Sequence, residues 1–479
     1  MKTRRHHPFG LQGLLGATLL ATLGCGSSGG PAAGLCPALD PITSWNSGTL
    51  HTGAVDAPET WTAAASPHKI VGTLDVNAAI TVEPCGIVLF APTDGGGETI
   101  LDLHAKGQFL AQGSADKPIL MKGLRRDDGS AEENGIAAIE ATGEVVRFAH
   151  VTFEGSAKSS DLSGSYFVRL VGLGERGSQQ LHVEHVTLRD GYGGGIFLSK
   201  AAVFTKESTD LTVTGMRALE GLREDTNMPL TAPVHFDDAQ GVSTLPSGSY
   251  AGNVTDHVAV GIFGSGDTHI DDGAHVWRDT GVPYYMLSKL FIAGTGGPTL
   301  TLEAGVTLQW TTGESDSNRG GIDVGYADEE GTLLVQGSAD RKVTMEGVTD
   351  DPGAWEGIEF FPKGAGSRLD HLILRHTGNG SNTSIAHCTD PSMQWARFAV
   401  GINFNAEPGM VPEATMIQNV TIENALAETA GIARGWIAKI DNCDSVDFLS
   451  GQGNEVVGLS TPQTAYTIEP MSAPSLCCP

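Results

Sequence analysis

The stretch FAHVTFEG at residues 148–155 decides the fold, because its pattern returns further along the chain. In each copy a polar residue is followed by alternating Val, Thr, Ile, Leu or Phe and then by a polar turn. An alternation with a period of two is typical of half-buried β-strands. The other copies are HVEHVTLRDG (182–191), LDHLILRHTG (369–378) and IQNVTIEN (417–424), with weaker copies at DLTVTG (210–215) and SVDFLSG (445–451).

These copies belong to two larger repeats. Matching stretches follow one another in the same order through both halves of the chain, which chance similarity does not produce. The sequence is therefore an internal duplication, with one half at 42–250 and the other at 251–479. The clearest matches are FLAQGSAD (109–116) with LLVQGSAD (333–340), ITVEPCGIVLF (80–90) with LTLEAGVTLQW (300–310), and ILMKG (119–123) with VTMEG (343–347).

The repeated strands predict a solenoid. They are short and end in Gly, Asn or Asp, and helical periodicity is nearly absent. Short strands that recur without intervening helices are typical of coils that stack in parallel about 4.8 Å apart. Coil corners need backbone with positive φ, which explains the 64 glycines.

A known family carries the same repeat. The run LTLEAGVTLQ followed by LLVQGSADRKVTM resembles bacterial right-handed parallel β-helix proteins with a pectin-lyase-like fold. The resemblance extends over about 60–240 and 277–460. It implies an all-β, right-handed parallel β-helix, arranged as two short β-helices in tandem or as one long one. It implies little about activity, because this fold hosts lyases, hydrolases, adhesins and inert stalks.

The start of the chain predicts export. Residues 1–24 combine a basic beginning with a short apolar run, as a signal peptide does. Leu23-Gly24-Cys25 resembles the bacterial lipobox, which implies that Cys25 becomes lipid-modified, whereas an ordinary cleaved signal is the alternative. Residues 25–41 are expected to form a flexible tether. We expect an outer-membrane lipoprotein on the periplasmic or cell-surface face, attached to the membrane through its lipid alone.

The cysteines agree with an oxidising compartment. Setting Cys25 aside from the 7 cysteines leaves an even number, and their spacings match no zinc motif. Their distribution suggests a Cys36–Cys85 bridge near the start and a cystine-rich cap at the C-terminal end. The disulfide candidates are Cys36, Cys85, Cys388, Cys443, Cys477 and Cys478.

The formal charge of −27 narrows the range of partners. So acidic a surface repels phosphate backbones, which argues against binding nucleic acid. It also repels polyuronates unless Ca²⁺ intervenes. A polysaccharide or an envelope protein is the expected partner, and Ca²⁺ is the one cofactor left open.

Four Asp-Asp pairs are the first candidates for chemistry. Paired carboxylates could serve as the acid and nucleophile of a glycosidase or as Ca²⁺ ligands of a lyase. Adjacent residues of a strand point to opposite faces, however, and each pair lies beside turn formers, which favours solvated corners. The sequence therefore assigns no catalytic, cofactor-binding or metal-ligating residue. The pairs are Asp127-Asp128, Asp237-Asp238, Asp271-Asp272 and Asp350-Asp351.

Histidines and tryptophans admit two interpretations each. His150, His185, His371 and Asn419 hold the same place in their repeats, either as a row for metal binding or proton transfer or as a ladder that bonds between coils or caps turns. The tryptophans could stack on sugar rings if exposed or fill coil corners if buried. Those considered are Trp61, Trp277, Trp310, Trp355, Trp395 and Trp436.

The absence of an enzyme signature favours a display or binding role. We expect a cell-surface or envelope lipoprotein whose non-catalytic β-helix has binding, structural or adhesive roles, with a glycan as candidate ligand, and which cleaves no polysaccharide. A passive spacer without a ligand belongs to the same class. The alternative is a secreted polysaccharide lyase or glycoside hydrolase on the same fold.

Overall fold

The computed structural model describes residues 36, 48–91, 99–123, 138–142, 145–155, 166–172, 174–217, 231–262, 267–311, 320–364, 366–378, 399–403, 416–425, 437–440 and 452–457. The chain divides into two compact units, residues 1–35 and residues 36–479, and all described strands belong to the second.

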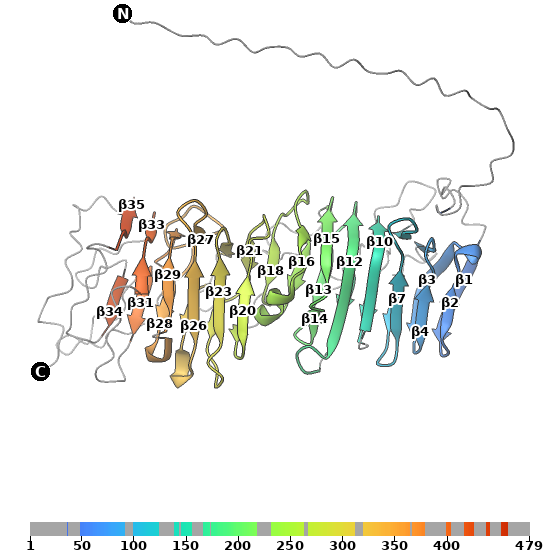
Figure 1. Cartoon of the computed structure of the whole chain (residues 1–479), viewed down its shortest axis with the longest axis horizontal. Coiled ribbons are helices and arrows are strands. Elements are labelled where there is room, and N and C mark those ends of the chain that lie inside the picture. Colours follow the sequence, from blue (N-terminus) through green and yellow to red (C-terminus); the bar gives the residue numbers. More distant parts are fainter. Residues whose placement is uncertain are drawn as a thin grey trace, which may run out of the picture. The chain divides into compact units, whose positions relative to one another are not determined.

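The second unit is a parallel β solenoid. The chain turns after each short strand and returns one coil further on, so each strand pairs in parallel with its counterpart of the preceding coil. Figure 1 shows the succession from β1 to β35. The all-β parallel β-helix expected from the sequence is confirmed, and the described residues contain no α-helix.

In the first half the chain visits three rows of strands in turn. The first, which we call the β4 row, contains β2 (Glu59–Trp61), β4 (Ala79–Val82), β7 (Gln108–Gln112), the first parts of β10 (Val145–Glu154) and β12 (Gln179–Arg189), and β14 (Ala202–Phe204). The second, the β8 row, contains β1 (Thr49–Val55), β3 (His68–Val76), β5 (Ile87–Ala91), β8 (Ile119–Gly123), the second parts of β10 and β12, β15 (Thr209–Thr214) and β17 (Gly248–Ser249).

The third row, which we call the long row, continues through both halves. It passes from β16 to β18 and β21 across residue 250 without a break, whereas the β4 row ends at β14, the β8 row ends at β17 and two other rows begin at β19 and β20. The division of the sequence at 250/251 stays a prediction about the repeat. The row contains the end of β3, then β6 (Ile100–Leu103), β9 (Ala138–Ala141), β11 (Tyr166–Leu170), β13 (Gly194–Leu198), β16 (Val234–Phe236), β18 (Val258–Val260), β21 (Tyr284–Met286), β24 (Thr307–Trp310), β27 (Val343–Gly347), β30 (Leu372–Arg375), β33 (Thr421–Glu423) and β35 (Glu455–Val457).

Two further rows complete the coils of the second half. One contains β19 (Thr268–Ile270), β22 (Leu290–Ile292), β25 (Ile322–Val324), β28 (Ile358–Phe360), β31 (Val400–Asn403) and β34 (Ile437–Ile440). The other contains β20 (Ala274–Trp277), β23 (Thr299–Glu303), β26 (Thr332–Gln336), β29 (Arg368–Asp370) and β32 (Ile417–Gln418). Short 3₁₀ turns join some strands, namely η1 (Ala63–Ala65), η3 (Ala239–Thr244), η5 (Tyr326–Asp328) and η6 (Pro362–Gly364).

The two halves are offset by one row. By the sequence match, β8 in the first half corresponds to β27 in the second. β8 belongs to the β8 row, whereas β27 belongs to the long row, which in the first half is built from β6, β9 and β11. Matching strands therefore do not continue one another along the solenoid.

Alternating side chains build the core. In β10 the side chains of Val146, Phe148, Val151 and Phe153 are buried, and each contributes about 1.5–3 kcal/mol relative to exposure. Neighbouring rings stack along the interior, with centroids 6.2 Å apart between Phe109 and Phe148. A strict alternation would place one outward residue between buried Phe148 and the next buried residue. Two residues stand between Phe148 and Val151 instead, because the chain turns a corner there.

Polar residues occupy this corner because of their backbone conformation. His150 and His185 have φ values of 48° and 51°. Asn, Asp and His tolerate this left-handed region better than other side chains that carry a Cβ. The polar position that opens each sequence repeat is thus a corner residue. The same conformation recurs at Asp210, His371 and Asn419.

Cys36 and Cys85 form a disulfide, as expected from their positions. Cys25, Cys388, Cys443, Cys477 and Cys478 lie outside the described residues, so the lipidation and the other bridges stay predictions. Among the described residues no helix has the length and apolar character needed to cross a membrane.

Candidate functional site

The outer face of the long row carries one side chain per coil in continuous register. The middle residue of each strand points away from the core because its two neighbours fill it, as Ile196 and Leu198 do on either side of Phe197. We call this line of outward residues the central column. It consists of Asp75, Asp102, Glu140, Arg169, Phe197, His235, Ala259, Tyr285, Gln309, Glu346, Arg375 and Glu423.

Aromatic rings form the middle of the central column. The rings of Phe197 and His235 meet edge to face with centroids 5.1 Å apart. The Nε2–H of His235 donates to the carbonyl of Gly261 at 2.8 Å, so its Nδ1 accepts from the hydroxyl of Tyr166 at 2.9 Å. Burial lowers the pKa of His235 to about 4, which keeps the ring neutral at neutral pH.

A second pair of rings lies on the next two coils. His257 stacks on Tyr285 with ring centroids 4.5 Å apart. Tyr285 also packs against Ala232, Ala259 and Leu287, a small apolar cluster separate from the main core. His257 is 7% exposed, yet its Nε2 has no hydrogen-bond partner among the described residues. Burial lowers the pKa of His257 to about 4, so this nitrogen belongs to a neutral ring.

The carboxyl group of Asp237, which lies beside these rings, has a raised pKa. Burial, and then the charge of Asp238, raise the pKa of Asp237 to about 7, against a smaller opposing effect of Arg169. Its Oδ1 lies 3.9 Å from Nε2 of His235. A carboxyl that titrates near neutral pH can exchange a proton under physiological conditions.

Ion pairs form within both charged ends of the central column. Arg169 binds Glu140 at 3.1 Å. Arg375 lies between two carboxylates, 2.6 Å from Glu423 and 3.4 Å from Glu346. These pairs join neighbouring coils, so their first role is to hold the stack together.

Taken together, the middle of the central column can accept a neutral, partly apolar ligand. Rings present an apolar face with polar edges, which suits sugar rings. Among the described residues beside these rings, Asp237 is the one group with a pKa near neutrality, whereas hydrolysis of a glycosidic bond requires two carboxyl groups in defined positions.

Two of the expected Asp-Asp pairs meet at one arginine. Arg176 Nε donates to Asp238 at 2.5 Å, and its Nη1 lies 3.2 Å from Asp271 and 3.3 Å from Asp272. Gln240 Nε2 also donates to Asp271. This cluster joins η3 to the loop after β19, at the junction of the two halves. Its geometry is that of a structural ion-pair network, since the guanidinium occupies the space between the carboxylates.

The remaining Asp-Asp pairs are not brought to a common site among the described residues. Asp350 is fully exposed and lies 3.8 Å from Nε2 of His376. Asp127 and Asp128 lie outside the described residues.

The corner histidines bond between coils. Nδ1 of His185 donates to Asp210 at 2.5 Å, and Nδ2 of Asn419 donates to Asp370 at 2.8 Å. His150 stacks on His185. The ladder interpretation therefore agrees with the geometry, although a ladder of this kind does not prevent metal binding.

The described tryptophans belong to the core. Trp61, Trp277, Trp310 and Trp355 are each at most 1% exposed, so they offer no platform to a sugar. Trp395 and Trp436 lie outside the described residues.

Sequence reasoning missed the central column. Its members are single outward residues separated by loops of unequal length, so no fixed spacing marks them.

The chain was compared with family models, with curated proteins and with solved structures. It matches no family model, no curated protein and no solved structure.

Proposed function

We propose that the chain is an exported, lipid-anchored β-helix of the pectin-lyase-like kind that binds a neutral glycan without cleaving it. The ligand would lie along the middle of the central column. The observation that carries this proposal is the group formed by Phe197, His235 and Tyr285, which are partly exposed rings of the central column in register on the long row.

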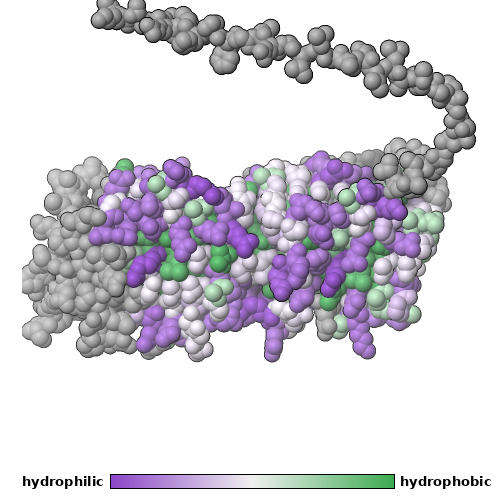
Figure 2. Space-filling view, in the orientation of Figure 1, coloured by the Kyte–Doolittle hydropathy of each residue, from purple (hydrophilic) through white to green (hydrophobic). Residues whose placement is uncertain are grey.

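The charge distribution supports a neutral ligand. With His235 uncharged, the central-column segment from Phe197 to Gln309 carries no formal charge. The molecule as a whole is strongly acidic, so an anionic polymer would be repelled. Figure 2 shows one face covered mainly by hydrophilic side chains with hydrophobic ones scattered between them, which suits a polar partner better than an apolar one.

The start of the sequence supports the proposed export and attachment to a membrane. The apolar leader, the Leu23-Gly24-Cys25 motif and the Gly/Ser-rich segment after it are the features from which a lipid anchor and a tether are inferred. A rigid solenoid held at a membrane by a flexible tether suits the display of a binding face.

Glycan-array binding of the wild-type chain and of Tyr285→Ala tests the proposal. We expect binding to neutral glycans that falls at least tenfold in the variant, because the ring that stacks on His257 is removed. Tyr326→Ala is the matched control, since Tyr326 is an exposed ring of the solenoid away from the central column. Equal binding by all three proteins, or binding to none of the glycans, would contradict the proposal.

A second candidate function is cleavage of a polysaccharide on the same face. The pKa of Asp237, near neutrality, is the observation that favours it. Incubation with pectate, alginate and neutral glucans, with and without Ca²⁺, separates the two functions. Degradation that is abolished by Asp237→Asn would establish the enzyme, whereas binding without degradation supports the display protein.

A further inference from the structure

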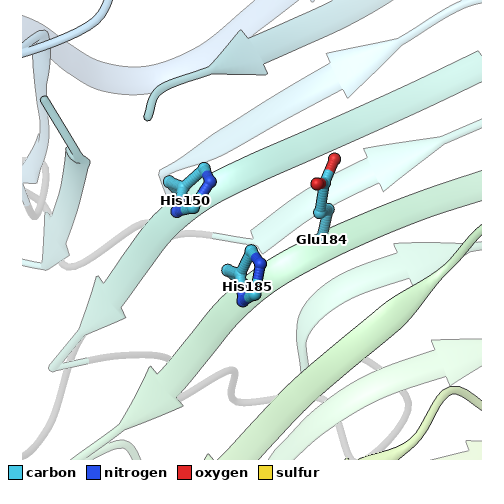
Figure 3. A group of neighbouring side chains, drawn as sticks. All are labelled: His150, Glu184 and His185. Carbon is cyan, nitrogen blue, oxygen red and sulfur yellow. The ribbon is translucent and has the colours of Figure 1, made fainter. Parts of the chain in front are cut away.

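Two histidines on neighbouring coils share one corner of the solenoid. His150 in β10 and His185 in β12 have ring centroids 4.6 Å apart with 24° between the ring planes. Glu184 precedes His185 and lies on the same side of the corner. Figure 3 shows the two imidazoles side by side with the carboxylate next to them. One ligand atom from each of the three residues can be chosen so that all lie within 4.8 Å of one another.

A neighbouring carboxylate orients one of these histidines. Asp210, on the next coil, accepts a hydrogen bond from Nδ1 of His185 at 2.5 Å. The other nitrogen, Nε2, then carries the lone pair. A carboxylate that binds the far nitrogen of a histidine is the usual outer partner of a metal-ligating imidazole, because it fixes the tautomer and the ring direction.

The other two donors are not used by the fold. His150 makes no hydrogen bond through its ring in the described part of the chain beyond its stacking on His185. Glu184 has one ionic neighbour there, His182, at 4.0 Å. The side chains of Glu184 and His185 are 48% and 49% exposed, so an ion can reach them from solvent.

We propose that His150, Glu184 and His185 bind a divalent transition-metal ion of the zinc type, with Asp210 holding His185 in place. Two imidazole nitrogens and one carboxylate, with solvent in the fourth position, form a donor set that Zn²⁺ accepts. Ca²⁺ and Mg²⁺ require oxygen ligands and are poorly served by it. The site is independent of the glycan face, since it lies at a corner beside the β4 and β8 rows and not on the long row.

The second half of the chain contains a natural counterpart that keeps one of the three ligands. The repeats align His150 with His371, Glu184 with Gln418, and His185 with Asn419. Asn419 has φ of 53°, close to the 51° of His185, so asparagine is accepted at this corner. His185→Asn and Glu184→Gln therefore convert one corner into the other with little risk to the fold.

Zinc titration of the full chain by calorimetry tests the proposal. The variants are His185→Asn, Glu184→Gln and Asp210→Asn, and His371→Ala is the matched control because it removes a corner histidine from the counterpart. Excess Mg²⁺ in the buffer suppresses nonspecific binding to surface carboxylates. Circular dichroism verifies that each variant keeps its β-structure.

We expect one class of zinc sites in the wild-type chain that Ca²⁺ does not occupy. Affinity should fall at least 100-fold in His185→Asn and 10- to 100-fold in Asp210→Asn, and should stay unchanged in His371→Ala. Absence of this class in the wild type, its persistence in His185→Asn, or an equal loss in His371→Ala would overturn the proposal. Cu²⁺ bound at the same site should show nitrogen hyperfine coupling, which a carboxylate-only site would lack.

Discussion

Trp310 and Trp355 lie face to face in the core of the second half, with ring centroids 4.3 Å apart and 3° between their planes. Trp310 ends β24, and Trp355 lies in the segment before β28. The Nε1–H of Trp355 donates to the carbonyl of Arg375 at 2.7 Å, which joins this stack to β30. The pair therefore holds together successive coils of the solenoid.

Replacing Trp355 by alanine should lower the free energy of unfolding by about 3–5 kcal/mol, because it leaves a large cavity and an unpaired carbonyl. Urea denaturation followed by circular dichroism measures the change. Leu50→Ala is the control, since Leu50 is 56% exposed and its truncation should change stability by less than about 0.5 kcal/mol. A loss for Trp355→Ala as small as that of the control would contradict this reading.

Replacing Lys289 by methionine should destabilise the protein by about 3–5 kcal/mol at pH 8, because two buried carboxylates lose their counter-ion. Nζ of Lys289 lies 2.9 Å from both Asp323 and Glu356. Burial already raises the pKa of Asp323 to about 6 even with Lys289 present. Protonation at pH 5 should therefore recover part of the loss, and denaturation at the two pH values measures this. A loss that does not depend on pH would show that packing, not charge, is responsible.

Asp237→Asn should become more stable relative to the wild type as pH rises from 4 to 8. The folded pKa of about 7 lies above the value of an unfolded aspartate, so the folded chain retains a proton that the unfolded chain has released. Wild-type stability therefore contains a loss that grows through this window, on the order of 4 kcal/mol for a shift of about three pKa units, and asparagine removes it.

The comparison cancels the histidines, which titrate equally in both proteins. Asp350→Asn is the control for Asp237→Asn, because the Asp350 side chain is fully exposed, and its stability difference should not change with pH. Urea midpoints at pH 4, 6 and 8 provide the measurement. A constant difference between Asp237→Asn and the wild type would contradict the buried-carboxyl assignment.

Cys25→Ser should release the protein from the membrane fraction without unfolding it, because the acyl chains are the expected anchor. Fractionation of cells with immunodetection measures the distribution. The double variant Cys36→Ser/Cys85→Ser, which removes the described disulfide, should stay in the membrane fraction. If the Cys25→Ser protein remains there as well, Cys25 is not the point of attachment.

Local pattern predicted much of the fold. The alternation in FAHVTFEG gave the buried Phe148 and Phe153, and the polar position His150 proved to be a corner because histidine accepts a positive φ. The Cys36–Cys85 bridge followed from the distribution of cysteines.

The contacts that could not be predicted depend on the length and path of the loops between strands, because these set which strands become neighbours. Arg176 binds Asp238 and Asp271, which lie far from it in the sequence. The strand register that places Phe197 beside His235 is set by loops of unequal length. The corner at His185 interrupts the alternation of the strand, so Glu184 and His185 can both approach His150.

The offset of one row between the halves determines how inherited surfaces are oriented. A feature copied by the duplication, such as the outward side chains of β8 and β27, faces two different directions around the axis. A straight polymer or a flat surface that lies along one row meets one copy and misses the other. Two ligand chains, or one chain that winds around the solenoid, can bind both copies at once. The duplication therefore favours the bridging of separate partners over a more extended contact with a single partner.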